Sequence, residues 1–282
     1  VRTLAFQCLQ VFFDQHASGG ALEGREEELA EGTVLALEGE KDPRCLLGGL
    51  ATVQALARSL GGCAPGRTAL ARVSDEAVDI LSCYFPVVFT PPPAGAPAGL
   101  TREAIVEALE GALSCCLEFA PYAVDLAAQK SASPNHRTQR ECLQLLRQLL
   151  KKFGPAAALA PVPTASGEIG GMLGSGDDRE AAARLWAVLG PLFGAVSAAE
   201  IGEEERKERQ LVAAAAADTL SLFLHHCCGV GAPESALGAE LEKMAWDDAH
   251  VESSLDFLRG GSNGGDVVPK ATLLSVEAAG FI

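Results

Sequence analysis

The densest group of metal-ligating side chains in the sequence is the run His225-His226-Cys227-Cys228. On a helix, His225 and Cys228 are three positions apart and share a face, so they could supply two ligands to one ion. A structural zinc site needs four ligands, which usually come as two close pairs. Because the sequence holds no second pair nearby, we interpret the run as the end of an apolar helix and expect no bound metal.

The other candidate groups also lack the partners that chemistry requires. Adjacent Cys115 and Cys116 would point about 100° apart on a helix, which is poor geometry for holding one ion. Asp247, Asp248 and His250 resemble an acid–base group, but Asp247 or Asp248 more simply caps a helix. The glycine-rich stretch 171–176 follows no strand and lacks the Lys-Ser/Thr ending of a phosphate loop. The sequence therefore predicts no catalytic residues, no cofactor and no enzyme.

Composition and charge exclude several other classes of protein. The chain has 282 residues, 22 Lys plus Arg against 37 Asp plus Glu, a net charge of −15, and 48% hydrophobic but only 5% aromatic residues. This is too apolar for a wholly disordered chain and too acidic for a direct nucleic-acid binder. Few aromatic residues argue against a sandwich or barrel, and no apolar run reaches the roughly 20 residues of a membrane helix.

The cysteines and the charged runs add two expectations. Nine cysteines, an odd number, occur without a C-x-x-C pair, which favours a reducing compartment over a secreted disulfide scaffold. The runs Glu26–Glu28 and Glu203–Arg209 are interpreted as solvated helix faces. An acidic docking patch for a basic partner is the alternative.

Helix punctuation recurs along the chain. Asp42-Pro43 predicts a helix start and Gly61-Gly62 its end. Ser74, Thr101 and Ser133-Pro134 are expected to open three further helices, the last of which ends at Lys151-Lys152 and Gly154. Such amphipathic helices joined by short turns predict an all-α fold, an α-α superhelix of the HEAT-like or armadillo type. A compact helical bundle is the structural alternative.

The expected organisation has three parts. Residues 1–154 are predicted to form HEAT-like helical repeats, 155–176 a flexible Pro/Ala/Gly/Ser-rich linker, and 177–282 further HEAT-like repeats. Helical patterns run to both ends of the sequence, from which we expect a fragment of a longer protein.

One segment, from Cys83 to Pro93, combines an aromatic cluster with three consecutive prolines. The prolines oppose a helix and favour an extended conformation. Three aromatic side chains within six residues would be costly to leave in water, so they are expected to pack across helix ends. The segment is thus interpreted as a clamp between repeats, with a ridge for docking a partner as the functional alternative.

This segment, followed by Gly99-Leu100-Thr101-Arg102-Glu103, resembles the methyl-methanesulfonate-sensitivity-nineteen family, and 39–47 resembles the upstream signature of that family. The resemblance extends from about Gly39 to Gly154 and continues weakly to the end. The signature residues, predicted to be structural or to dock partners, are Asp42, Pro43, Arg44, Tyr84, Phe85, Pro86, Phe89, Thr90, Pro91, Pro92 and Pro93.

The resemblance implies a non-catalytic adaptor of the cytosolic iron–sulfur assembly targeting complex, active in the cytoplasm and nucleus. Implied partners are a WD-repeat propeller subunit, a DUF-fifty-nine-type subunit and apo iron–sulfur clients such as helicases and polymerases. No direct nucleic-acid or membrane contact is expected. The alternatives are a subunit acting in RNA polymerase II transcription or nucleotide excision repair, and a generic HEAT-repeat adaptor.

Overall fold

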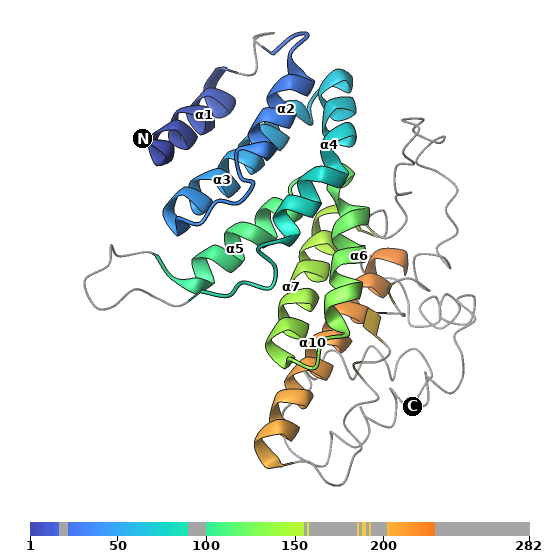
Figure 1. Cartoon of the computed structure of the whole chain (residues 1–282). Coiled ribbons are helices and arrows are strands. Elements are labelled where there is room, and N and C mark those ends of the chain that lie inside the picture. The colour runs from blue at the N-terminus through green and yellow to red at the C-terminus, as the bar shows by residue number, and fades with distance from the viewer. Residues whose placement is uncertain are drawn as a thin grey trace. The chain divides into compact units, whose positions relative to one another are not determined.

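The computed structural model describes residues 1–16, 22–89, 100–154 and 202–228, and the single residues Ala157, Leu185, Val188, Leu189 and Leu192. Every regular element in this part of the chain is helical (Figure 1). The elements are α1 (Arg2–His16), α2 (Glu26–Leu35), α3 (Pro43–Leu60), α4 (Ala64–Ser82), α5 (Arg102–Leu113), the short 3₁₀ helix η2 (Leu117–Phe119), α6 (Ala120–Ser131), α7 (His136–Phe153) and α10 (Glu203–Cys228). None of these helices is long and apolar enough to cross a lipid bilayer.

The chain divides into two compact units, and the boundary falls inside α6. Among the described residues, the first unit comprises 1–126 and the second begins at Ala127. The first unit therefore holds α1 to α5, and the second holds α7 and α10.

Helices in the first unit pack on their second neighbours in the chain. In one layer α3 packs between α1 and α5, and in the other α4 packs against α2 and η2 (Figure 1). Contacts of α3 with α2 and α4 join the two layers. This alternation is the arrangement of stacked helix pairs in an α-α superhelix, whereas a bundle gathers its helices around one core. The prediction of an all-α helical-repeat fold is confirmed.

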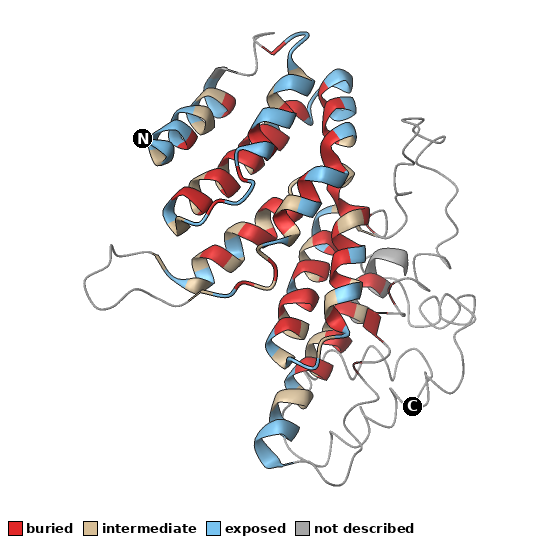
Figure 2. Cartoon of the chain, in the orientation of Figure 1, coloured by how far each residue is buried: buried red, intermediate tan, exposed pale blue. Residues whose placement is uncertain are grey.

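Small residues on α3 allow the first layer to pack closely. A Cβ atom on Gly49 would lie 2.2 Å from Cδ2 of Leu37 and 3.2 Å from Cζ of Phe6 on α1, so a larger residue there would force these side chains to move. The Thr52 hydroxyl donates to the Phe6 carbonyl oxygen over 3.1 Å and ties α3 to α1. Figure 2 shows the buried residues of α3 and α4 along the sides where these helices meet their neighbours.

In the second unit, α7 packs against α10. The buried face of α7 carries leucines at 143, 145, 146, 149 and 150. Two ion pairs flank it, Arg140–Glu208 at 3.2 Å and Arg147–Asp218 at 3.5 Å. Apolar burial thus holds the pair together, and the partly exposed ion pairs add little to its stability.

The predicted helix ends have mixed outcomes. Asp42 and Thr101 cap α3 and α5, as expected, and α7 ends at Gly154 with φ of 59°. Ser74 was expected to start a helix, which is wrong, because it is buried within α4 and its hydroxyl donates to the Ala71 carbonyl oxygen. The start at Ser133-Pro134 is also wrong, because Asn135 caps α7 instead.

Several expectations fall on residues outside the described part. These include most of the 155–176 linker and all helices expected after residue 228. The division into 1–154, 155–176 and 177–282 stays a prediction.

Candidate functional site

The first half of the family signature forms the start of α3. Oδ1 of Asp42 accepts the Arg44 backbone N–H over 3.0 Å, and Pro43 occupies the first turn, where its missing N–H costs nothing. The Arg44 guanidinium returns to the same carboxylate, with Nη2 to Oδ2 at 3.0 Å. This hydrogen-bonded guanidinium lowers the pKa of Asp42.

Glu40 lies in the signature stretch 39–47 but was not among the residues predicted to be structural or to dock partners, and it stabilises this helix start. Its side chain is only 3% exposed. Oε1 accepts the backbone N–H groups of Lys41 and Asp42 over 2.9 and 2.8 Å, and Oε2 lies 2.8 Å from Nη1 of Arg2 on α1. A buried carboxylate needs such compensation. Glu40 therefore links the loop between α2 and α3 to α1.

The second half of the signature approaches the same loop from the end of α4. The Tyr84 hydroxyl donates to the Leu37 carbonyl oxygen over 2.5 Å, across 47 sequence positions. Partial burial of the phenol raises the pKa of Tyr84. The structure thus brings Tyr84 to the loop that precedes Asp42 and Arg44, which the sequence alone did not indicate.

After Tyr84 the chain continues as an irregular segment, 85–89, whose side chains alternate between buried and more exposed positions. Phe85 and Val87 are buried, whereas Val88 is 94% exposed and Phe89 is half-buried. The peptide bond between Phe85 and Pro86 is cis. Arg102 at the start of α5 donates from Nε to the Val87 carbonyl oxygen over 3.0 Å.

The remaining signature residues, Thr90, Pro91, Pro92 and Pro93, lie outside the described residues. We name the surface formed by the α2–α3 loop, the end of α4 and Val88 the signature cluster. Its polar groups bond to backbone and to one another, so the cluster positions helix ends. Whether it also docks a partner remains a prediction.

The structure supplies no additional metal ligands for the candidate groups within the residues whose side chains are described. The helix α10 includes 225–228, whose side chains lie outside the described part. Where side chains are described, no three His, Cys, Asp or Glu residues gather in a way that could hold a metal ion. The stretches 171–176 and 247–250 are likewise outside.

The assumption that Cys115 and Cys116 lie on a helix is wrong. Helix α5 ends at Leu113, and Cys116 has an extended backbone with φ of −143° before η2. Burial, together with a hydrogen bond that the Cys116 thiol donates to Cys115, raises the pKa of Cys116 well above its usual range. Such a thiol is a poor nucleophile and metal ligand.

The acidic runs are placed as solvated helix starts. Glu26, Glu27 and Glu28 form the first turn of α2, where negative charge is favoured by the helix dipole. Glu27 pairs with Arg72, and Glu28 pairs with Arg25 at 3.1 Å. The run 203–209 forms the start of α10. It contains two ion pairs between residues one helical turn apart, Lys207–Glu203 and Arg209–Glu205.

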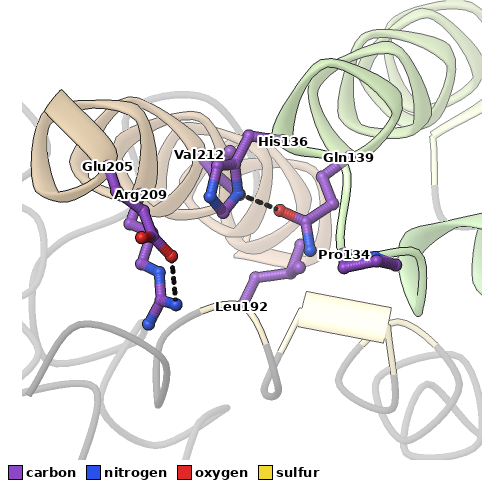
Figure 3. Close-up of a pocket in the computed structure, with 7 residues that line it drawn as sticks. All are labelled: Pro134, His136, Gln139, Leu192, Glu205, Arg209 and Val212. Carbon is purple, nitrogen blue, oxygen red and sulfur yellow. Dashed lines mark hydrogen bonds and ion pairs between the residues drawn. The ribbon is translucent and has the colours of Figure 1, made fainter. Parts of the chain in front are cut away.

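A pocket of about 230 Å³ lies within the second unit, between the start of α7 and α10 (Figure 3). Its polar groups pair with one another. Nδ1 of His136 lies 3.0 Å from Oε1 of Gln139, and Nη2 of Arg209 lies 2.7 Å from Oε1 of Glu205. The remaining lining residues are Pro134, Leu192 and Val212. The pocket is smaller than most ligand sites. Nε2 of Gln139 also donates to the Ser133 carbonyl oxygen over 3.0 Å, which holds the turn before α7 in place.

Comparison with known proteins identifies relatives of this chain. Residues 1–165 match the MMS19 N-terminal family, described as Dos2-interacting transcription regulator of RNA-Pol-II. The chain is 33% identical over 137 residues to the MMS19 nucleotide excision repair protein homolog of Xenopus laevis. The aligned stretch covers 46% of this chain and 13% of that protein. The human homolog is 31% identical over 137 residues, 46% of this chain and 12% of the relative.

The Arabidopsis thaliana homolog is 30% identical over 154 residues, 54% of this chain and 13% of that protein. The matched stretch is therefore about an eighth of the length of these relatives. No solved structure matches the chain. Because the family match covers more than half of the 282 residues, the chain belongs to the MMS19 family through its N-terminal region.

Proposed function

We propose that this chain is part of a non-catalytic adaptor that brings the cytosolic iron–sulfur assembly machinery to apo iron–sulfur proteins of DNA replication and repair. The observation that carries the proposal is the family match over 1–165, and the two-layer helical packing of the first unit supports it. Helical repeats of this kind offer long continuous surfaces suited to binding several proteins.

The proposed partners are a WD-repeat propeller subunit, a DUF-fifty-nine-type subunit and clients such as helicases and polymerases. The proposed locations are the cytoplasm and the nucleus, where the protein would meet both the iron–sulfur assembly machinery and its client proteins. The proposal that the chain is not an enzyme draws on the names of its relatives, which describe a repair protein and a transcription regulator.

A tagged form of the longest chain that the gene encodes tests this function. Affinity purification from the source cell is expected to recover the propeller subunit and iron–sulfur clients. Recovery of neither, from a protein that is folded and expressed at its natural level, would contradict the adaptor role in iron–sulfur assembly.

The docking role of the signature cluster has its own test. Val88→Asp adds a charge at a residue that is 94% exposed, so stability should not change. If the cluster docks a partner, recovery of at least one partner should fall several-fold. Leu211→Asp, at a residue 47% exposed on α10, is the matched control. Equal recovery with both variants would mean that the cluster is structural only.

A second candidate function is supported by the names themselves. The family description refers to transcription by RNA polymerase II, and the relatives are named nucleotide excision repair proteins. Under this alternative the chain acts by contacts with the transcription or repair machinery. It predicts partners without iron–sulfur clusters and a nuclear pool that persists after assembly factors are depleted.

A further inference from the structure

The adjacent cysteines Cys115 and Cys116 lie in the short connection between α5 and η2, within the first compact unit. The Cys115 backbone N–H still donates to the Ala112 carbonyl oxygen of α5, over 3.2 Å. Cys116 has left the helix, with φ of −143° and ψ of 161°. The pair therefore lies where the end of a helix changes into an extended backbone.

This change of direction brings the two sulfur atoms together. Adjacent side chains point about 100° apart on a helix and to opposite sides of an extended strand, so neither regular conformation places neighbouring thiols in contact. Here the Cys116 thiol donates a hydrogen bond to Cys115. The fold thus holds the two sulfur atoms next to each other, as the formation of a disulfide bond requires.

The two thiols differ in their access to solvent. Cys115 is partly exposed, whereas Cys116 is 7% exposed. Because burial also raises the pKa of Cys116, this thiol keeps its proton near neutral pH. A small oxidant would therefore react first at Cys115, and Cys116 would be the resolving thiol beside it.

We propose that Cys115 and Cys116 form a redox modification site, at which hydrogen peroxide converts the two thiols into a disulfide between adjacent residues. In the first step the Cys115 sulfur attacks one peroxide oxygen. An S–O bond forms, the O–O bond breaks, and the leaving hydroxide takes the Cys115 proton as water, which leaves a sulfenic acid. In the second step the Cys116 sulfur attacks the Cys115 sulfur. The S–S bond forms, the S–O bond breaks, and the hydroxide leaves with the Cys116 proton as a second water, so the two electrons lost by the sulfur pair have reduced the peroxide.

The spacing of adjacent residues makes such a disulfide easy to reverse. Disulfides usually join Cα atoms about 4.4–6.8 Å apart, whereas consecutive Cα atoms lie about 3.8 Å apart across a trans peptide bond. The ring that closes is therefore strained, and strained disulfides are reduced more readily than structural ones. The site suits a reversible response to oxidation better than a permanent cross-link.

Ring closure would change the backbone at the point where η2 begins. Glu118 of η2 pairs with Arg67 of α4 over 3.0 Å, and Phe119 is 1% exposed. On the other side, the Ser114 hydroxyl donates to the Glu110 carbonyl oxygen over 2.7 Å. Because the connection is anchored at both ends, the disulfide should weaken the packing of η2 on α4. The inference does not depend on the proposed function.

Trypsin gives a direct readout of the disulfide. Cleavage after Arg102 and Lys130 releases residues 103–130, in which Cys115 and Cys116 are the only cysteines, and the pair 227–228 is released in a different peptide. The folded chain is treated with hydrogen peroxide, denatured and blocked with iodoacetamide before digestion and mass spectrometry. We expect the peptide 103–130 to lose two hydrogen atoms and take up no iodoacetamide. Dithiothreitol should restore both thiols.

Three results would overturn the proposal. Alkylation of both thiols after peroxide treatment would show that the pair is inert. Oxidation of Cys115 to a sulfinic acid, with Cys116 still reduced, would show that Cys116 does not resolve the first product. Linkage of 103–130 to another peptide would assign the oxidation to a different pair of cysteines.

Substitutions separate the roles of the two cysteines. Cys116→Ser should accumulate the Cys115 sulfenic acid, which dimedone traps, and Cys115→Ser should leave Cys116 as a thiol. Cys63→Ser, at an exposed cysteine before α4, is the matched control and should form the disulfide as the unmodified chain does. Equal dimedone labelling of Cys116→Ser and the unmodified chain would contradict the proposal. If Cys116→Ser does not fold, the peptide measurement on the unmodified chain still decides.

The unfolding temperature tests the effect on η2. Peroxide should lower the unfolding temperature of the unmodified chain, dithiothreitol should restore it, and the unfolding temperature of Cys115→Ser should not change. A disulfide that forms without changing the unfolding temperature, or an equal fall in Cys115→Ser, would contradict the weakened packing of η2 on α4.

Discussion

At the scale of single residues, the signature cluster depends on polar groups that no periodic pattern reveals. Glu40 is one of 37 acidic residues, and although it falls in the signature stretch 39–47, its residue type gives no sign that it is buried. Only its burial and its bonds to two backbone N–H groups and Arg2 distinguish it. Hydrogen bonds to a buried charge are worth more than those between neutral groups, so this carboxylate should contribute to stability.

Replacing Glu40 by glutamine tests this contribution. The amide keeps one acceptor oxygen but loses the charge that pairs with Arg2, so the free energy of unfolding should fall by about 1–2 kcal/mol. Urea denaturation of the chain measures the change. Glu38→Gln, two positions away at an exposed residue, should change it by less than about 0.5 kcal/mol. Equal effects of the two substitutions would contradict the special role of Glu40.

The Tyr84 hydroxyl predicts a dependence on alkaline pH. Burial raises the pKa of Tyr84 in the folded protein, so the folded state keeps the neutral phenol when the unfolded chain ionises near pH 10. The stabilisation is therefore complete below about pH 10 and is lost as the pH rises through the folded value.

The variant Tyr84→Phe isolates this effect. Below about pH 9 it should be less stable than the unmodified chain by about 0.5–1 kcal/mol, the value of one hydrogen bond. The difference should shrink above pH 10, as measured by urea denaturation at several pH values. Tyr122, whose pKa burial also raises, is present in both proteins and cancels. A difference that stays constant with pH would contradict the assignment.

At the scale of elements, local chemistry determines where three of the described helices begin, α3, α5 and α7. Asp42, Thr101 and Asn135 each accept a backbone N–H of the first turn, at distances of 3.0, 3.1 and 2.9 Å. Such caps can be recognised from a few neighbouring residues. Ser74 does not mark a helix start because serine is also tolerated inside helices, where its hydroxyl bonds to a carbonyl of the preceding turn.

The cap of α7 can be tested with matched variants. Asn135→Ala removes the side-chain oxygen that accepts from Arg137 and Thr138, and should cost about 1 kcal/mol of unfolding free energy. Asn135→Asp keeps an acceptor at the positive end of the helix dipole and should cost little. The midpoints of urea denaturation compare the two. An aspartate variant as unstable as the alanine variant would argue against capping.

Helix α2 shows where element prediction from sequence fails. Its buried residues are only Ala30, Thr33 and Val34, and three glutamates open it. From the sequence alone, that start therefore reads only as a solvated charged run. Packing of a few small side chains against α4 completes the helix, and that packing is not visible in a local pattern.

At the scale of the whole molecule, the net charge of −15 predicts no affinity for DNA. Phosphate backbones are bound by basic faces, and five of the basic residues on α7 and α10 are already engaged by acidic neighbours, namely Arg137, Arg140, Arg147, Lys207 and Arg209. A gel-shift assay with duplex DNA at about 0.15 M salt should show no complex. A complex that weakens steeply as salt rises would contradict this expectation and reveal a basic face.

The sequence by itself determined the all-α class, the caps of α3 and α5, and the family resemblance that the later comparison confirmed. These properties depend on residues close together in the chain, whose chemistry acts within one or two helical turns. The tertiary structure decided that Glu40, Arg2 and Tyr84 meet at one loop, and that η2 packs against α4 through Glu118 and Arg67. Both follow from contacts between residues about 40 or more positions apart, and the free energy of those contacts depends on how whole helices stack.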